Sequence, residues 1–118
     1  MKLLVVDDSK LMQKSVIKFF GECLPEAEFI LASDGEEGYT IFKDVQPEIM
    51  TIDLLMPRVS GLELLKKISQ EPHSTKLFVI SADVQKAVQQ EVESLGAIFI
   101  SKPLTPDKAR EIVKLIKG

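Results

Sequence analysis

Three aspartates at the ends of two apolar runs are the residues of this chain best suited to chemistry. Asp7 and Asp8 come directly after residues 2–6, and Asp53 comes directly after residues 48–52. Each run is short, partly β-branched and followed by a helix-like pattern, which predicts a parallel strand with its acid at the carboxyl end, where open α/β sheets bind ligands. Together the acids would form a pocket for a hard cation that takes oxygen ligands and keeps some of its water. This description fits Mg²⁺ better than zinc or copper.

Two later apolar runs end in polar residues of complementary chemistry. Residues 76–80 lead into Ser81, and residues 97–100 lead into Ser101 and Lys102. A hydroxyl and an ammonium are therefore expected beside the acids on one edge of the sheet. One anionic group would then be held from three sides.

The strand-like runs alternate with amphipathic stretches of helical spacing. The expected strands are 2–6, 28–32, 48–52, 76–81 and 97–100, and the expected helices are 9–23, 35–44, 60–70, 84–95 and 105–117. Such an alternation predicts repeated βα units and a parallel sheet covered on both faces. The most apolar runs, 2–6 and 48–52, are expected at the centre of the sheet, and 28–32 is expected at an edge.

The polar residues at the strand ends also match a known family. The matching set is Asp7-Asp8, Asp53 with Met56-Pro57 and Gly61, Ser81-Ala82, and Lys102-Pro103. This pattern resembles the receiver domain of two-component response regulators over essentially all 118 residues, and it is most similar to the free-standing type found in chemotaxis. The resemblance implies a doubly wound, flavodoxin-like α/β fold with five helices and strand order 2-1-3-4-5. Residues 1–118 are then expected to form a single receiver domain.

The acids have distinct expected roles in phosphoryl transfer. A carboxylate attacks a phosphoryl group poorly because both are anionic, so positive charge must be placed around them. Asp8 and Asp53, with Asp7 acting through water, are expected to hold Mg²⁺ there, and by family resemblance the backbone carbonyl of Leu55 completes the protein's ligands. Asp53 stands alone at its strand end and is the candidate nucleophile. It would accept a phosphoryl group from the phosphohistidine of a histidine kinase.

Lys102, Ser81 and two backbone N–H groups are the expected ligands of the phosphoryl oxygens. Lys102 supplies a point charge, and Ser81 supplies a hydroxyl donor. The N–H groups of Leu54 and Ala82 are further donors. A cis bond before Pro103 costs little and would turn the Lys102 side chain toward the pocket, an arrangement for which receivers are known.

Residues near Asp53 are expected to control the shape of the loop that follows it and the rate at which water attacks the phosphorylated state. Met56-Pro57 and Gly61 would fix this loop, since Gly permits a tight turn and Pro limits slack. Leu55 and Asp83 would flank the path of an attacking water. An apolar Leu55 should hinder that water, whereas Asp83 would either orient it or repel phosphate, so the lifetime of the phosphorylated state stays open.

The resemblance also implies a switch and an output surface. Phe99 stands where receivers carry an aromatic residue that changes rotamer on activation, together with Ser81; the alternative is an ordinary half-buried strand aromatic. Because Phe lacks the hydroxyl of the more frequent Tyr, such a switch would work by ring burial. The surface for a downstream partner is expected on residues 84–116.

His73 is expected to be exposed and without function, and Cys23 to be a small packing residue.

Composition limits the partners and the compartment. The net charge is −3, and the 15 basic residues are spread along the chain without a basic stripe, which argues against direct nucleic-acid binding. No apolar run reaches membrane-spanning length, so no membrane insertion is expected. The lone Cys23 cannot form an internal disulfide, and a reducing cytoplasm is the expected location. The expected form is a monomer that catalyses its own phosphorylation and dephosphorylation but acts mainly as a signalling switch.

Other functions fit the pattern less well. A phosphatase of the haloacid dehalogenase type normally needs a second acid where Leu55 stands, and a flavin carrier needs a Ser/Thr/Gly-rich loop in place of residues 7–10, whose acids would repel a phosphate. A non-phosphorylatable scaffold would not need the complete set of acids, Ser and Lys. The choice between a lone regulator, a phosphate sink and an excised domain stays open, as do the kinase, the target and phosphorylation-driven dimerisation.

Overall fold

Strands and helices alternate along the whole chain in the computed structural model, which describes residues 1–56 and 60–117. The strands are β1 (Lys2–Val6), β2 (Glu28–Ala32), β3 (Ile49–Ile52), β4 (Lys76–Ser81) and β5 (Ala97–Ser101). The helices are α1 (Lys10–Cys23), α2 (Gly35–Val45), α3 (Gly61–Ser69), α4 (Lys86–Ser94) and α5 (Pro106–Lys117).

The strands form one parallel sheet in the order β2-β1-β3-β4-β5. This order confirms the flavodoxin-like topology expected from the sequence, with β3 at the centre and β2 at an edge. All four residues of β3 are buried, as expected for a central strand covered on both faces. The edge strand β2 keeps Glu28 and Leu31 exposed.

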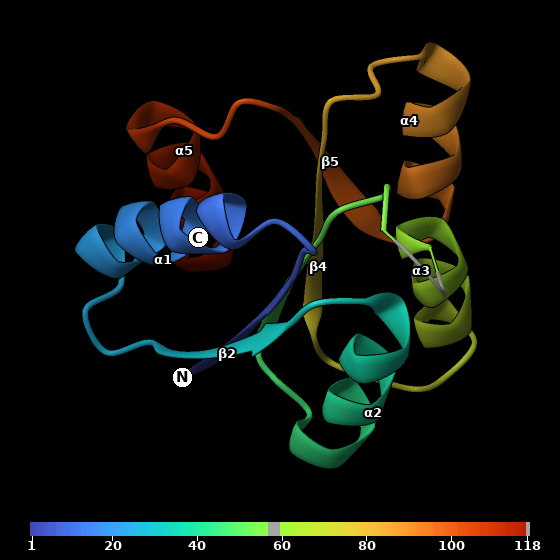
Figure 1. The fold of residues 1–118 in the computed structure, drawn as a ribbon, viewed down its shortest axis with the longest axis horizontal. Helices are drawn as coiled ribbons and strands as arrows, with labels where there is room; N and C mark the ends of the chain where they lie inside the picture. Colours follow the sequence, from blue (N-terminus) through green and yellow to red (C-terminus); the bar gives the residue numbers. More distant parts are fainter. Residues whose placement is uncertain (57–59, 118) are drawn as a thin grey trace.

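Helices cover both faces of the sheet (Figure 1). Their packing on the sheet creates two apolar cores. Neighbouring residues of β1 alternate between the cores, because successive strand side chains point to opposite faces. One core contains Leu4 and Val6 with residues of α2, α3 and α4, and the other contains Leu3 and Val5 with residues of α1 and α5. The carboxyl ends of the strands are left between these two layers, where loops lead into the helices.

Side-chain caps explain where several helices begin. The hydroxyls of Ser9 and Ser60 accept hydrogen bonds from backbone N–H groups in the first turns of α1 and α3, and the Asp34 carboxylate does the same for α2. Helix α4 has no such cap. It begins at Lys86 rather than at the expected residue 84, because the Asp83 carboxylate binds the Gln85 N–H in a turn before the helix.

Two individual expectations have different outcomes. The sequence suggested that His73 is exposed, and this was wrong: the residue is half-buried. Its ring lies edge-on to Phe42 at a centroid distance of 5.8 Å. The surrounding Pro and Ser suggested a solvated loop, yet the loop folds back over α2. Cys23 packs against the core between the sheet and α1, as expected. Among the described residues, no helix is long and apolar enough to cross a membrane.

Candidate phosphoryl-acceptor site

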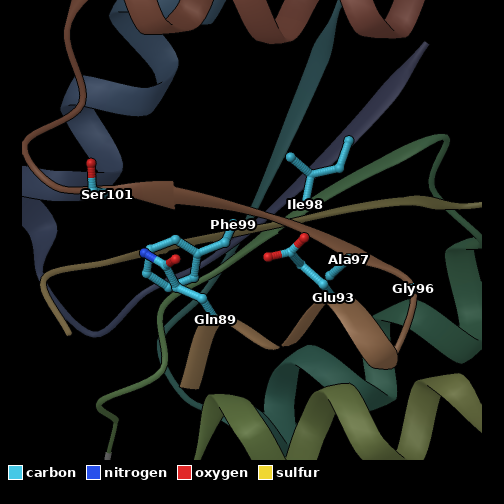
Figure 2. A pocket seen from close by; sticks show the side chains of 7 residues that line it. All are labelled: Gln89, Glu93, Gly96, Ala97, Ile98, Phe99 and Ser101. Atoms are coloured by element: carbon cyan, nitrogen blue, oxygen red, sulfur yellow. The ribbon is translucent and has the colours of Figure 1, made fainter. Parts of the chain in front are cut away.

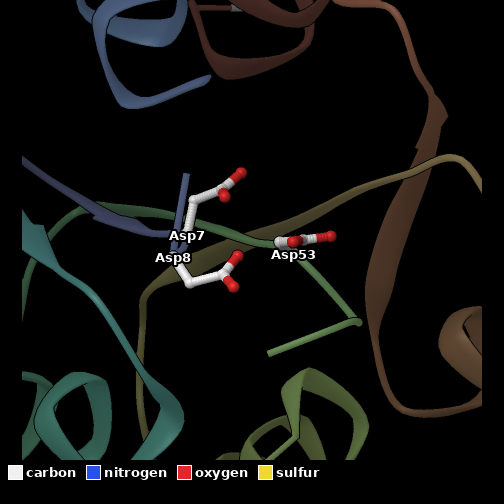
Figure 3. Close-up of side chains that lie close together, drawn as sticks. All are labelled: Asp7, Asp8 and Asp53. Carbon is white, nitrogen blue, oxygen red and sulfur yellow. The ribbon is translucent and has the colours of Figure 1, made fainter. Parts of the chain in front are cut away.

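The parallel register of β1 and β3 brings the three aspartates together. Val6 pairs with Ile52, so the residues that follow them leave the sheet at the same level. The Asp53 N–H donates to the Val6 carbonyl at 2.9 Å, which continues the ladder by one residue. Each aspartate offers a carboxylate oxygen within 4.8 Å of the others, and Figure 3 shows the Asp7 and Asp8 carboxylates directed toward the side on which Asp53 lies.

The three acids differ in burial and in their partners. Asp7 and Asp53 are only 4% and 6% exposed, whereas Asp8 is open to solvent. Asp7 Oδ1 accepts a hydrogen bond from the Ser9 N–H at 2.9 Å, which fixes this carboxylate over the start of α1. The amide of Gln13 donates to the Asp7 carbonyl at 2.7 Å and holds the backbone from below. Asp7 is therefore a fixed inner acid, and Asp8 is an accessible outer one.

Burial raises the pKa of both inner carboxyls. Loss of solvent is the largest cause for Asp7, the Ser9 N–H opposes it, and the charge of Asp53 raises the pKa further. Desolvation is also the largest cause of the raised pKa of Asp53, against the opposing charge of Lys102. A cation added to this pocket would stabilise the ionised form of both carboxyls.

Lys102 reaches this pocket from the end of β5. Its Nζ lies 3.5 Å from Asp53 Oδ1 and 3.9 Å from Asp7 Oδ2. The Lys102 N–H donates to the Ser81 carbonyl at 2.9 Å, which ties the loop to the end of β4. The peptide bond between Lys102 and Pro103 is cis.

Ser81 is fully buried at the end of β4. Its hydroxyl oxygen accepts a hydrogen bond from the Asp83 N–H at 3.1 Å, which leaves its own proton for a second partner. The following Ala82 is exposed, so its backbone is near solvent at the mouth of the site. The expected phosphoryl ligands Ser81 and Ala82 thus start the loop that leads into α4.

Gly61 is needed for a different reason from the one the sequence suggested. A Cβ at this position would lie 2.0 Å from the Asp53 carbonyl oxygen and 2.6 Å from the Leu54 Cα. The Gly61 N–H donates to the Leu54 carbonyl at 3.1 Å, so the start of α3 packs directly on the backbone that carries Asp53. Close approach, rather than an unusual backbone turn, requires glycine here.

The residues that follow Asp53 differ in their exposure to solvent. Leu54 is buried, whereas Leu55 is 69% exposed at the rim. The Leu55 N–H makes a long 3.5 Å contact with Asp53 Oδ1, which helps to orient the carboxylate. Met56 is half-buried against the core, and the Pro57 of the predicted motif lies outside the described residues.

A second feature lies away from the acids, on the α4–β5 face. A pocket of about 540 Å³ is lined by residues of α4 and β5 and by Gly96 between them (Figure 2). Phe99 is half-buried in this lining, beside the polar side chains of Gln89 and Glu93. The expected switch residue therefore borders a hollow that a binding partner can reach.

The structure brings together Asp7, Asp8, Asp53 and Lys102, as their strand-end positions predicted. The set combines hard oxygen ligands with one nearby ammonium, and this donor set suits a hydrated divalent cation. Sequence reasoning missed Gln13, which supports the site from α1. Its only signal was a polar side chain facing inward on an amphipathic helix.

Residues 3–114 match the family model of the response regulator receiver domain, and the chain belongs to this family. The chemotaxis protein CheY of Thermotoga maritima is 32% identical, with 98% of this chain and 96% of that protein covered. The chain is also 36% identical to part of a longer relative, protein-glutamate methylesterase/protein-glutamine glutaminase 3 of Geobacter sulfurreducens. That match covers 97% of this chain but spans only 30% of the relative.

The fold similarity extends to solved structures. A chain in the CheX–CheY complex with BeF3 and Mg²⁺ from Borrelia burgdorferi superposes with a TM-score of 0.90 at 28% identity, over 100% of this chain and 90% of that one. The chain is thus a CheY-like receiver domain of two-component signalling. Receivers as a family bind Mg²⁺ and interact with histidine kinases and downstream effectors. Nothing in the similarities favours a haloacid dehalogenase-type phosphatase.

Proposed function

We propose that this receiver accepts a phosphoryl group on Asp53 from the phosphohistidine of a histidine kinase, with Mg²⁺ bound beside it. The observation that carries the proposal is the position of the Asp53 carboxylate, which shares one pocket with two other acids and lies 3.5 Å from Lys102. Asp7 occupies the same pocket, but its Oδ1 is already bound by the Ser9 N–H. Of the two buried acids, Asp53 lies nearer to the Lys102 ammonium, and it stands at the end of the central strand.

The carboxylates divide the metal site between them. Asp8 and Asp53 would bind Mg²⁺ directly, Asp7 through water, and the carbonyl of Leu55 would complete the protein's share. Bound Mg²⁺ supplies the positive charge that lets an anionic nucleophile approach an anionic phosphoryl group. The exposure of Asp8 supports this division, because an accessible carboxylate can replace a water of the hydrated ion without rearranging the core.

Asp53 and Lys102 have complementary tasks in the transfer step. An Asp53 carboxylate oxygen forms the new O–P bond as the N–P bond to the histidine breaks, and the imidazole leaves and takes up a proton. Lys102 stabilises the negative charge on the transferred oxygens, and the N–H groups of Leu54 and Ala82 add dipoles aimed at the same charge. The acceptor thereby contributes to its own phosphorylation.

Ser81 and Phe99 would carry the signal from the site to the surface. Val79 pairs with Phe99, and Ser81 stands two positions after Val79, so Ser81 and Phe99 project from the same face of the sheet on adjacent strands. A hydrogen bond from the Ser81 hydroxyl to the phosphoryl group would pull the loop inward and admit the ring of Phe99. The pocket of Figure 2 would then change shape.

The downstream partner is proposed to bind the α4–β5–α5 face. The match to CheY proteins over nearly their full length supports a chemotaxis-type role for residues 1–118 as one receiver domain. The proposed form of this domain is a monomer. The proposed location is the cytoplasm, where a lone thiol such as Cys23 stays reduced.

Labelling with acetyl phosphate and Mg²⁺ tests the acceptor assignment. Intact mass spectrometry should detect one added phosphoryl group on the wild type, and the group should be stable in acid and labile in base. Asp53→Asn should remove this labelling, whereas Asp44→Asn, a change at an exposed acid on α2, should leave it intact. Labelling of Asp53→Asn to the wild-type extent would show that another residue is the acceptor.

A further inference from the structure

The loop that carries Lys102 is bound by a second lysine. The ammonium of Lys108, in the first turn of α5, donates to the Ser101 carbonyl at 2.7 Å and to the Pro103 carbonyl at 3.0 Å. It also lies 3.3 Å from the Ser101 hydroxyl oxygen. One side chain therefore binds the carbonyls on both sides of Lys102 in the chain.

The backbone of Lys102 is also held by a second element, strand β4. Its own N–H donates to the carbonyl of Ser81 at 2.9 Å, at the end of β4. The loop is thus attached to β4 through one hydrogen bond and to α5 through the Lys108 ammonium. From this loop the Lys102 side chain extends to the acid pocket, where its ammonium lies near Asp53 and Asp7.

The position of Lys108 is unfavourable unless the loop carbonyls compensate for it. A cation in the first turn of a helix opposes the helix dipole, which favours acids such as Asp107 at this end. The Lys108 N–H is already used in the Thr105 cap of α5, so the helix start and the ammonium are fixed together. Charge-assisted hydrogen bonds to two carbonyls are stronger than neutral ones and offset the dipole.

We propose that Lys108 is a positioning residue for phosphoryl transfer: by binding the Ser101 and Pro103 carbonyls, it holds the Lys102 ammonium at the acid pocket. This inference depends on the proposed roles of Asp53 and Lys102. Lys108 has no contact with the reacting atoms in this role. Its effect passes entirely through the placement of Lys102, and small displacements of a catalytic group cost large factors in rate.

Kinetics on three variants provide the main test. Lys108→Met removes the charge and the donors at similar length, Lys108→Arg retains both, and Lys114→Met removes an exposed lysine from the same helix. Initial rates of Asp53 phosphorylation are measured over a range of acetyl phosphate concentrations at saturating Mg²⁺. Lys108→Met should slow the reaction by about tenfold with an unchanged affinity for Mg²⁺. Lys108→Arg should recover most of the rate, and Lys114→Met should match the wild type.

A double-mutant cycle separates positioning from general destabilisation. In a Lys102→Met background, adding Lys108→Met should cause no further loss of rate, because the group that it positions is already absent. A further loss equal to that seen in the wild-type background would overturn the proposal and assign Lys108 a structural role. A Lys108→Met rate equal to the wild type, in a protein whose Lys102→Met variant is slow, would also overturn it.

The wild-type protein allows a test that does not depend on the folding of any variant. Ammonium protons that are held in hydrogen bonds exchange slowly with water, so the side-chain NH₃⁺ signal of Lys108 should be visible by nitrogen-15 NMR where that of Lys114 is lost. Equal exchange of the two ammonium groups would show that Lys108 does not hold the Ser101 and Pro103 carbonyls, and would overturn the proposal. Failure of the proposed chemistry has a separate signature: no labelling of the wild type at Asp53, or an unchanged rate in Lys102→Met.

Discussion

Lys102 Nζ lies 3.5 Å from Asp53 Oδ1 and 3.9 Å from Asp7 Oδ2, so one ammonium faces two buried carboxylates. A third acid, Asp8, completes the pocket, and a single positive charge leaves it negative when all three are ionised. The geometry therefore pairs Asp53 with a cation and still leaves charge for a metal ion. The predictions below follow from this imbalance and from the packing around it.

Magnesium binding should depend more on Asp8 than on Asp7. Asp8→Asn removes a proposed direct ligand, whereas Asp7→Asn changes one that acts through water, for which losses of about 10–100-fold in affinity are typical. Isothermal titration calorimetry of both variants gives the comparison. Because Mg²⁺ binds the folded state, it should also raise the melting temperature, with about 2.7 kcal/mol of stabilisation at a hundredfold excess over Kd. A larger loss in Asp7→Asn than in Asp8→Asn, or no thermal shift in millimolar Mg²⁺, would contradict the proposed metal geometry.

Asp7 and Asp53 should contribute less to the stability of the metal-free protein as the pH rises above 3.8. Burial raises the pKa of Asp7 and Asp53 above the ordinary value of 3.8, so the folded state holds more protons than the unfolded state between that value and the raised ones. The contribution of these groups to the free energy of unfolding therefore falls as the pH increases through this window. Urea unfolding at several pH values in EDTA, with and without added Mg²⁺, measures the effect.

Removing one buried charge should stabilise the metal-free protein at neutral pH. Asp7→Asn keeps a carbonyl oxygen that can accept the Ser9 N–H but removes the like charge beside Asp53. Its free energy of unfolding in EDTA should exceed that of the wild type, and the gain should shrink when Mg²⁺ is added. Asp44→Asn, at an exposed position, serves as the control. A lower stability for Asp7→Asn in EDTA would mean that its ionised form is favourable in the fold.

Gly61→Ala should destabilise the protein strongly. Its Cβ would lie 2.0 Å from the Asp53 carbonyl oxygen, so the start of α3 and the strand end must separate, at a cost of at least about 1–3 kcal/mol. Gly21→Ala is the matched control, because its Cβ would meet only the Phe29 ring at 3.8 Å. This change within α1 should stabilise the helix by up to about 1 kcal/mol. Chemical denaturation of both variants decides whether the close approach is as tight as described.

Signal transmission should be separable from phosphorylation. Ser81→Ala and Phe99→Ala should keep labelling at Asp53 but lose most of the phosphorylation-dependent gain in partner affinity. Leu31→Ala, which truncates an exposed apolar residue on the edge strand β2, should keep both. Beryllofluoride, standing in for the phosphoryl group, permits a direct test by amide chemical shifts. Shifts confined to the surroundings of Asp53, with Phe99 and Lys86–Ser94 unchanged, would exclude this route.

Much of this architecture is encoded locally in the sequence. Short apolar runs alternating with amphipathic stretches determine parallel strands and covering helices, because each element has its own hydrophobic period. In a parallel sheet all carboxyl ends share one edge, so the positions of Asp7, Asp53 and Lys102 after their runs were enough to predict that they gather there. Ser9, which directly follows the two acids, is of a residue type that favours helix N-caps, and it caps α1.

Other properties depend on the packing of segments that are distant in the chain. The burial of Asp7 beside the open Asp8, the half-buried position of His73 and the contact of Gly61 with the Asp53 backbone follow from how loops close over the sheet. The hydrogen bonds of Lys108 to the carbonyls of Ser101 and Pro103 likewise require α5 to pack back near the end of β5. Sequence periodicity records which face a residue occupies, whereas distances and pKa shifts arise from the three-dimensional arrangement of neighbouring charges and the solvent that packing excludes.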